Sequence, residues 1–307
     1  MKLYFAPLEG ITTYIYRRTH AEMFDGCDEY YAPFISPTEN ERISIKNLKD
    51  IMPENNLVQP KVQALVNNAD ALLGFMDKIK ELGYDEVNLN FGCPSSTVVK
   101  KRKGAGFLRD TDELDSFLYE VFEKCKMPVS VKTRTGYFSG DEMDTLIDIY
   151  NKYPISLLIV HPRTRMDFYN GEPDMAVFEK TYTMSKNKLC YNGNIFNVSD
   201  FKYIAERFEK LDSVMLGRGA VANPALFREI KGGKKLTTAE LIEFSERLID
   251  NYYAVLKSDT FTLYKLKEIW MYVMMNFPDE KKIFKGIKKA NKLSDFTRTI
   301  KLLPEIQ

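Results

Sequence analysis

Short apolar runs rich in β-branched and aromatic residues alternate with longer amphipathic segments along residues 1–233. The runs lie at 3–6, 29–32, 58–63, 86–90, 129–134, 157–161, 189–192 and 213–217. Helical spacing fills the intervals, for example at 69–82 before Gly83, and from Thr111, where a threonine cap precedes early acidic residues. About eight strands alternating with helices predict an α/β fold, a (β/α)8 TIM barrel, whose usual size is about 250 residues.

A doubly wound parallel sheet is the alternative fold, because it shows the same alternation. Such folds often place a glycine-rich turn, G-x-G-x-x-G, after the first strand to hold a dinucleotide. Here the first run continues instead as APLEG at 6–10. The barrel is therefore the favoured prediction.

The pattern changes after Lys235, and no strand-like run follows. The stretch TTAE at 237–240 matches a capping box that opens a long helix toward Lys257. Two or three further helical segments are predicted, with Pro278 and Ser294 as starts. We therefore expect two domains, a barrel at 1–233 and a small all-helical domain at 236–307.

With 307 residues, 44% of them hydrophobic, the chain can bury a large core. No apolar run approaches the roughly 18 residues that a membrane span needs, and Pro7 interrupts the N-terminal stretch too early for a signal peptide. We expect a cytoplasmic protein with no membrane contact. Nothing in the sequence requires a stable protein partner, so a monomer is expected.

The chain has four cysteines and two histidines, and none of them has the close spacing of a zinc site. We therefore expect no metal. Cys27, Cys125 and Cys190 are interpreted as small buried residues. Cys93 differs, because it stands between Gly92 and Pro94, where a strand gives way to a turn.

The net charge of +1 hides an asymmetry. Residues 231–307 hold 15 Lys and Arg against 10 Asp and Glu, a net charge of +5, which leaves −4 on residues 1–230. Lysines recur from Lys281 to Lys292 with no acidic residue between them. Such a cluster is typical of nucleic-acid contact, although a solvated helix face gives the same pattern.

Polar and reactive residues fall at the ends of the predicted strands. In a TIM barrel the active site lies at the C-terminal ends of the strands. Any one of these residues has a structural interpretation, as an edge-strand, surface or core residue. Their joint placement indicates a binding site, because polar groups inside a barrel mouth are costly unless they bind something. They are Glu9, Gln63, Asn90, Cys93, Lys132, Arg134, His161, Asn192 and Arg218.

The loops after the seventh and eighth runs are NGN at 192–194 and GRG at 217–219. In this fold these loops often bind phosphate, since glycines let backbone N–H groups approach the oxygens and arginine adds charge. Lys132 and His161 are placed to hold a polar ring from the side. The pattern predicts a planar cofactor with a phosphate tail, and flavin mononucleotide (FMN) is the candidate.

Eight stretches together resemble the tRNA-dihydrouridine synthase family. They follow the family's order through the whole barrel, and the N-x-G-C-P element with the later GAG is the most specific. They are APLEGIT at 6–12, VQA at 62–64, NLNFGCP at 88–94, GAGFL at 104–108, VKTRTG at 131–136, VHPRTR at 160–165, NGNI at 192–195 and MLGRGA at 215–220.

The resemblance implies an FMN-dependent enzyme that reduces uridine to 5,6-dihydrouridine in tRNA, with NADPH as the reductant and an RNA-binding helical domain. It implies that Cys93 is the general acid, and that Asn90, Arg134 and Tyr169 face the uracil. The residues implied to contact FMN are Pro7, Leu8, Glu9, Gln63, Lys132, His161, Asn192, Gly193, Asn194, Gly217 and Arg218. The chain departs from the family pattern at Pro162, Asn194 and Tyr137, which leaves some of these contacts open.

The expected chemistry transfers a hydride from reduced FMN to uracil C6 and a proton from Cys93 to C5 on the opposite side of the ring. A thiol suits this role because its ordinary pKa of about 8.5 keeps it protonated at neutral pH. Lys100, Lys101 and Arg102 follow in the same loop and are expected to hold RNA phosphates. The target base must be extruded from the folded RNA to reach a barrel mouth.

Two alternative functions stay open. One is a flavin-dependent oxidoreductase of free pyrimidines, similar to dihydroorotate dehydrogenases, which would not need residues 236–307. The other is an RNA-binding barrel without catalysis, which the presence of Cys93, Lys132 and His161 disfavours. The sequence leaves open the uridine position, tRNA against rRNA, and NADPH against NADH.

Overall fold

The computed structural model describes residues 1–37 and 45–306. Its sheet has eight parallel strands in the order β2-β1-β8-β7-β6-β5-β4-β3. They are β1 (Lys2–Phe5), β2 (Glu29–Tyr30), β3 (Val62–Ala64), β4 (Val87–Phe91), β5 (Val129–Arg134), β6 (Leu158–His161), β7 (Leu189–Tyr191) and β8 (Ser213–Leu216). The last strand pairs with the first along its whole length, with Lys2 opposite Ser213 and Phe5 opposite Leu216.

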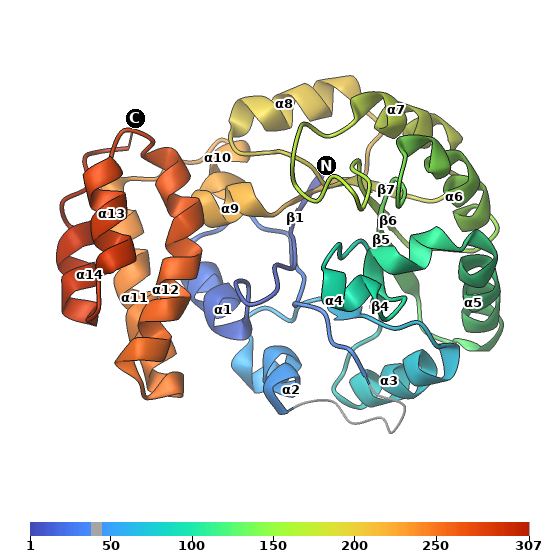
Figure 1. The fold of residues 1–307 in the computed structure, drawn as a ribbon, viewed down its shortest axis with the longest axis horizontal. Helices are drawn as coiled ribbons and strands as arrows, with labels where there is room; N and C mark the ends of the chain where they lie inside the picture. The colour runs from blue at the N-terminus through green and yellow to red at the C-terminus, as the bar shows by residue number, and fades with distance from the viewer. Residues whose placement is uncertain (38–44, 307) are drawn as a thin grey trace.

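Backbone bridges between the segment after β2 and β3 close the sheet into a barrel. Tyr31 pairs with Lys61 and Ile35 with Ala64, and Ile35 N donates to Gln63 O at 2.8 Å. Figure 1 shows the ring of helices around this sheet. The predicted TIM barrel is confirmed, and the doubly wound alternative is wrong because β8 returns to β1 instead of ending at a free edge.

The barrel helices follow the expected alternation. They are α1 (Tyr14–Met23), α2 (Ile45–Ile51), α3 (Ala69–Glu81), α4 (Ser96–Val99), α5 (Thr111–Lys124), α6 (Met143–Tyr150), α7 (Met175–Met184), α8 (Val198–Arg207), α9 (Arg218–Ala222) and α10 (Leu226–Ile230). Short 3₁₀ turns occupy Pro53–Asn55, Gly104–Arg109, Gly140–Glu142 and Met274–Asn276. α3 ends before Gly83, which has φ +85°, as the sequence predicted.

Two local predictions in the barrel are wrong. The cap of α5 is Asp110, whose side chain accepts from Glu113 N at 3.0 Å, so Thr111 is the first helical residue. The third strand begins at Val62 instead of 58, because Leu57 and Val58 are 59% and 43% exposed and Pro60 has no N–H to donate to a strand partner.

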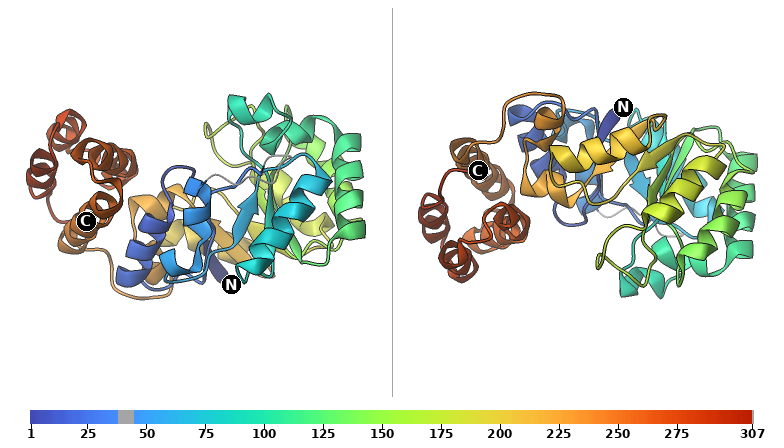
Figure 2. Two further views of the ribbon diagram at one scale, coloured as in Figure 1. Left: turned by 90° about the horizontal axis from the view of Figure 1, so that it is seen from below. Right: turned by 90° about the horizontal axis from the view of Figure 1, so that it is seen from above.

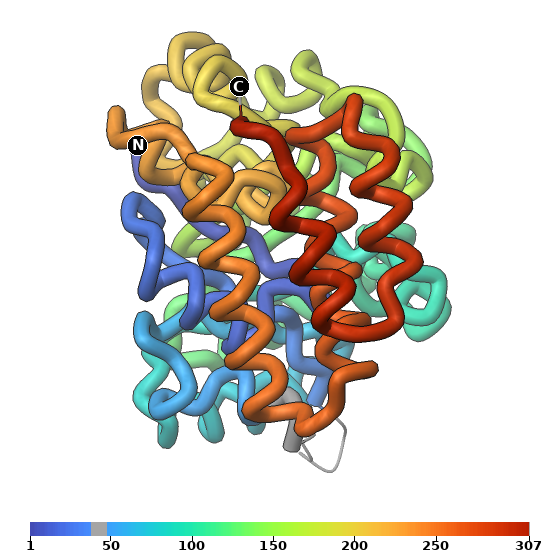
Figure 3. Tube along the Cα trace, turned by 90° about the vertical axis from the view of Figure 1, so that its left-hand side faces the viewer, coloured from blue at the N-terminus to red at the C-terminus, as the bar shows by residue number. Residues whose placement is uncertain are grey.

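The C-terminal part is helical, with α11 (Thr238–Leu256), α12 (Asp259–Val273), α13 (Lys281–Lys289) and α14 (Leu293–Ile300). The capping box of α11 is confirmed, since Thr237 and Glu240 bond each other's backbone N–H. α13 begins three residues after Pro278, but Ser294 lies inside α14, whose N-cap is Lys292. Figures 2 and 3 show these helices packed together on one side of the barrel.

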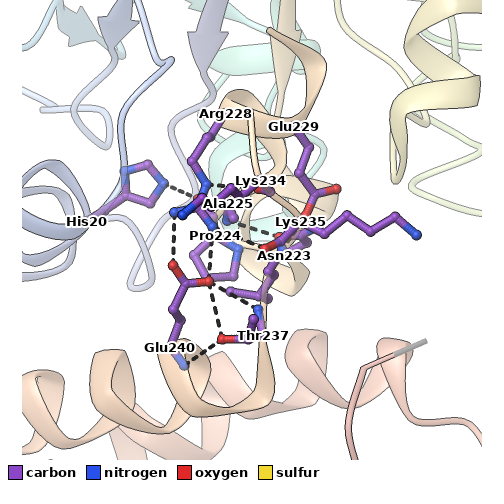
Figure 4. Close-up of polar contacts among 11 residues, drawn as sticks. His20, Asn223, Pro224, Ala225, Arg228, Glu229, Lys234, Lys235, Thr237 and Glu240 are labelled. Atoms are coloured by element: carbon purple, nitrogen blue, oxygen red, sulfur yellow. Dashed lines mark hydrogen bonds and ion pairs between the residues drawn. The ribbon is translucent and has the colours of Figure 1, made fainter. Parts of the chain in front are cut away.

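The barrel and the C-terminal helices meet at a polar junction beside α10 and the start of α11 (Figure 4). Arg228 donates from both terminal nitrogens to the Glu240 carboxylate, each at 3.0 Å, and its Nε donates to Lys234 O. Glu229 accepts from Asn223 Nδ2 at 3.0 Å. A paired arginine fork of this kind fixes relative orientation as well as charge, so α11 is held firmly against α10.

His20 of α1 is buried at the same junction. Its Nε2 lies 2.8 Å from Pro224 O, and its Nδ1 lies 2.7 Å from Tyr30 Oη. A carbonyl only accepts, so Nε2 carries the proton and Tyr30 donates to Nδ1. Burial lowers the pKa of His20 from 6.5 to about 4. The ring is therefore a neutral structural group at neutral pH.

This histidine predicts an acid-sensitive fold. The unfolded chain takes up the His20 proton below about pH 6.5 while the folded protein resists it until about pH 4. The free energy of unfolding should therefore fall over that interval, by up to about 1.4 kcal/mol per pH unit. Urea titrations between pH 7 and 4 measure this. His20→Gln should flatten the slope relative to the native protein, and an unchanged slope would contradict the assignment.

Among the described residues, every helix is too short or too polar to cross a membrane.

Candidate functional site

A cavity of about 470 Å³ opens at the C-terminal ends of the strands. It brings together Cys93, Asn90, Arg134, Tyr169 and every predicted cofactor contact except Asn194. Residues from β3, β4, β5 and β6 and from the segments after β1, β2, β7 and β8 contribute to the wall. The lining residues are Ala6, Pro7, Leu8, Glu9, Ile11, Pro33, Phe34, Gln63, Asn90, Gly92, Cys93, Pro94, Lys132, Arg134, His161, Tyr169, Asn192, Gly193, Gly217, Arg218 and Tyr272.

A buried chain of amide groups runs across β3, β4 and β5 below the cavity. Asn88 Nδ2 donates to Ser130 Oγ at 3.0 Å, and Gln63 Nε2 donates to Asn88 Oδ1 at 2.7 Å. Asn90 Nδ2 then donates to Gln63 Oε1 at 2.7 Å. Each amide is thereby oriented by its neighbour, which fixes the polar groups that Gln63 and Asn90 present at the cavity.

Asn90 connects this chain to the cysteine loop. Its Oδ1 accepts from Gly92 N at 3.1 Å and from Cys93 N at 2.9 Å. The loop also folds back on itself, because Ala105 N donates to Cys93 O at 3.0 Å. A Cβ at Gly104, which has φ +57°, would meet Cys93 O at 2.8 Å, so this close return requires glycine.

The Cys93 thiol lies half-buried at the cavity wall. Burial raises its pKa above the ordinary value, and this outweighs the lowering effects of the Ser95 backbone and of Arg134 and Lys132. Raising the pKa keeps the proton on sulfur at neutral pH. The thiol is therefore equipped to donate a proton and poorly equipped to act as a thiolate nucleophile.

Lys132 and Arg134 reach the cavity from β5. Burial, and then the neighbouring Arg134, lower the pKa of Lys132 from 10.5 to about 8. Arg134 is held on both sides, since Nε donates to Gly92 O at 2.8 Å and Nη1 donates to Thr164 O at 2.8 Å. Arg134 thus joins the cysteine loop to the loop after β6 while keeping a positive charge beside the cavity.

Arg163, which stands two residues after His161 at the end of β6, determines which ring nitrogen of His161 carries the proton. Arg163 Nη1 lies 2.9 Å from His161 Nε2, and its Nε donates to Asn170 O. A guanidinium only donates, so Nε2 accepts and the ring proton lies on Nδ1. Burial and the adjacent cations lower the pKa of His161 well below 6.5. The ring is neutral, with Nδ1–H as its donor.

Asn194 lies behind the cavity wall instead of lining it. Its Oδ1 accepts from Arg218 Nη2 at 2.8 Å and from Arg163 Nη2 at 3.3 Å, while its Nδ2 donates to Glu172 at 2.9 Å. Its position therefore suits orienting Arg218. The Asn194 amide can take the place of the acid that is common at this position in the family, because its oxygen accepts hydrogen bonds from both Arg218 and Arg163.

Tyr169 lies between two arginines, with Arg134 Cζ 5.3 Å and Arg218 Cζ 5.0 Å from the ring centroid. Tyr169 is 53% exposed, so part of the side chain stays accessible to a ligand between the two guanidinium groups. Tyr272, from α12, also lines the cavity and was missed from the sequence. It follows an ordinary helical pattern, and only the packing of α12 against α9 brings it there.

Lys100, Lys101 and Arg102 do not line the cavity. They follow α4 on the outer side of the cysteine loop, and all three are exposed. Arg102 pairs with Glu113 at 3.1 Å. The sequence correctly placed these three residues in the same connection as Cys93. The structure adds that they are exposed at its outer surface.

A closed barrel with neutral and cationic donors gathered at the C-terminal mouth has the architecture of a TIM-barrel enzyme. The family model for dihydrouridine synthase (Dus) matches residues 4–302. The chain therefore belongs to the dihydrouridine synthase family.

Curated relatives agree with this family assignment. A Rickettsia bellii protein named probable tRNA-dihydrouridine synthase is 31% identical over 182 residues, which are 57% of this chain and 55% of that protein. The match thus spans about half the length of that relative. A Shigella flexneri protein named tRNA-dihydrouridine(16) synthase is 26% identical over an alignment 317 residues long, gaps included. The alignment covers 99% of this chain and 98% of that protein.

Among solved structures, the old yellow enzyme from Trypanosoma cruzi has a TM-score of 0.52 at 11% identity, covering 75% of this chain and 88% of that chain. At this identity the likeness shows the barrel fold alone.

Proposed function

We propose that this protein reduces uridine to 5,6-dihydrouridine in tRNA, with FMN as cofactor and NADPH as reductant. The observation that carries the proposal is one cavity in a dihydrouridine synthase barrel that gathers a protonated thiol, Cys93, with Lys132 and His161. A proton donor and cationic or N–H donors on one cavity suit the reduction of a polar, planar double bond.

The cavity fits a flavin. Its volume of about 470 Å³ falls in the range of cofactor sites. Lys132, the His161 Nδ1–H and the Gln63 amide offer donors for the carbonyl and nitrogen groups of a flavin ring. Arg218 and the backbone at Gly193 and Gly217 offer the charge and close approach that a phosphate needs. The remaining proposed contacts are Pro7, Leu8, Glu9 and Asn192, with Asn194 acting through Arg218.

FMN, when bound, would supply the hydride that adds at uracil C6. Cys93 would donate its proton to C5. Asn90 would hold the cysteine loop in place, because its Oδ1 accepts hydrogen bonds from Gly92 N and Cys93 N. Arg134 and Tyr169 would bind the uracil, because the positive charge of Arg134 and the partly exposed ring of Tyr169 border the cavity. Arg163 would keep the His161 proton on Nδ1.

The helices of residues 236–307 are proposed to hold the RNA, and residues 1–233 to form the catalytic barrel. α13 buries Ile283 and Ile287 and exposes its lysines, so its polar face is cationic. Such a face grips phosphate without reading sequence. We further propose that the protein acts as a cytoplasmic monomer, with tRNA as its partner.

A positional map of dihydrouridine in RNA from cells with and without the gene tests the function. Loss at one or more tRNA positions is the expected result, and position 16 is included because the Shigella relative's name specifies it. The purified protein with FMN and NADPH should restore the modification in RNA from the deletion strain. An unchanged map, with turnover of free uracil or orotate, would favour the free-pyrimidine alternative instead.

A further inference from the structure

A second cleft, of about 660 Å³, lies on the outer side of the cysteine loop. We call it the outer cleft. Gly92, Cys93 and Pro94 face the cavity, whereas the next residues of the same loop face the outer cleft. Its lining residues are Ser96, Val99, Lys100, Arg102, Gly106, Arg109, Asp110, Glu113, Tyr137 and Arg165.

Arginines and aromatic rings alternate along one wall of the outer cleft. Arg109 Cζ lies 5.2 Å from the Tyr137 centroid, and Arg165 Cζ lies 5.6 Å from the same ring and 4.8 Å from that of Phe168. The Arg165 Nε is buried with no hydrogen-bond partner among the residues that the structure describes. Arg165 Nη1 contacts only the Met166 sulfur, at 3.4 Å, so among the described residues no oxygen accepts from this guanidinium and its terminal nitrogens are available to an anionic ligand.

The residues that line the outer cleft carry a net positive charge, because four basic side chains face two acidic ones. Arg102 pairs with Glu113, and the Asp110 carboxylate caps α5. Lys100, Arg109 and Arg165 make no ion pair within residues 1–37 and 45–306. The cleft therefore presents positive charge to an anion, next to apolar rings.

The cavity and the outer cleft share their walls. The loop after β6 supplies Tyr169 to the cavity and Arg165 to the outer cleft, with Phe168 between them. Arg134 ties this loop to the cysteine loop, donating to Phe168 O at 2.7 Å and to Gly92 O at 2.8 Å. A polymer with one unit in the cavity would therefore have its neighbouring units beside the outer cleft.

We propose that the outer cleft binds the RNA strand immediately beside the target uridine, with Arg109, Arg165 and Lys100 on a backbone phosphate. This proposal rests on the proposed function. Single-stranded RNA is recognised by cations along its backbone and by bases stacked on aromatic rings and guanidinium planes. Phe138 contacts the Tyr137 ring and is 63% exposed, and Phe168 packs against Arg165 and is 37% exposed, so both keep accessible ring surface for a neighbouring base.

The test is steady-state reduction of tRNA by the FMN-loaded protein with Arg109→Gln, Arg165→Gln and the double substitution. Each single change should raise KM for tRNA about tenfold, the usual effect of losing a charge-assisted hydrogen bond. The slope of log affinity against log salt should become shallower by about 0.7–0.9 for each phosphate that the variant no longer neutralises. Reduction of the flavin by NADPH without RNA should stay at the native rate.

Arg207→Gln is the matched control. Arg207 also lies over aromatic rings, 5.9 Å from Tyr203 and 5.6 Å from Phe208, but it ends α8 on the outside of the barrel. It should leave KM and the salt slope unchanged. Because Arg109 is exposed, its substitution should not unfold the protein, even if Arg165→Gln does.

The outcomes separate the two proposals. An active native protein whose Arg109 variant matches it in KM and salt slope would overturn the outer-cleft assignment. Native protein that forms no dihydrouridine in RNA would overturn the proposed function itself. If Arg207→Gln raised KM as much as Arg109→Gln, the effect would reflect general charge, and the outer cleft would again be wrong.

Discussion

Replacing Cys93 with alanine is expected to lower the rate of uridine reduction about 10²- to 10⁴-fold, the contribution usually made by one positioned general acid. The flavin should stay bound, because its proposed contacts on Lys132, His161 and Gln63 do not involve the thiol. Single-turnover oxidation of the NADPH-reduced protein by tRNA, under anaerobic conditions, measures the effect. The yellow absorbance of the bound flavin reports its retention.

Cys93→Ser and Cys125→Ala are the companion variants. Serine keeps the shape but is a far weaker acid, so it should resemble alanine in rate. Cys125 caps the end of α5 and does not line the cavity, so its replacement should leave the rate unchanged. Native single-turnover rates in Cys93→Ala would show that another group donates the proton.

The sequence predicted most of this fold because strand and helix periods are local signals. The alternation of apolar runs was sufficient to identify all eight strands and the barrel. The alternation did not predict the element boundaries correctly at two places. The Asp110 side chain caps α5 one residue earlier than expected, and β3 begins only at Val62, after Pro60. Such competition between neighbouring residues is not visible in periodicity.

The candidate site was predictable to the extent that its residues stand at strand ends. Gln63, Asn90, Lys132 and His161 lie where the ends of parallel strands converge, and the structure brings them together. Tyr272 was not predictable, because it comes from a helix distant in sequence. The proton position on His161 was not predictable either, because it depends on an arginine bond in three dimensions.

Lys132→Met is expected to make the flavin-free protein more stable while weakening its flavin binding. Burial lowers the Lys132 pKa from 10.5 to about 8, so keeping the charge inside the folded protein costs up to about 3 kcal/mol at neutral pH. Methionine has similar length and no charge to bury. The free energy of unfolding should rise by about 1–3 kcal/mol at pH 7. Urea titration of the flavin-free protein measures it.

The stability gain should depend on pH in one direction. Below about pH 8 folded and unfolded native chains are both protonated at Lys132, and the full cost applies. Between about pH 8 and 10.5 the folded chain releases the proton first, so the difference from Lys132→Met should shrink. Lys202→Met, on the exposed face of α8, should show no such dependence.

The affinity for FMN should fall in Lys132→Met, whereas the stability of the flavin-free protein rises. A retained positive charge beside the cofactor favours its electron-rich groups, so Lys132→Met should weaken FMN affinity by about one or two factors of ten, as expected when a charge-assisted hydrogen bond is removed. Fluorescence titration with FMN measures this. A variant with lower stability and native affinity would contradict both parts, and Lys132 would then be a structural residue. Higher stability together with weaker FMN binding would instead show that the Lys132 charge favours cofactor binding and destabilises the flavin-free protein.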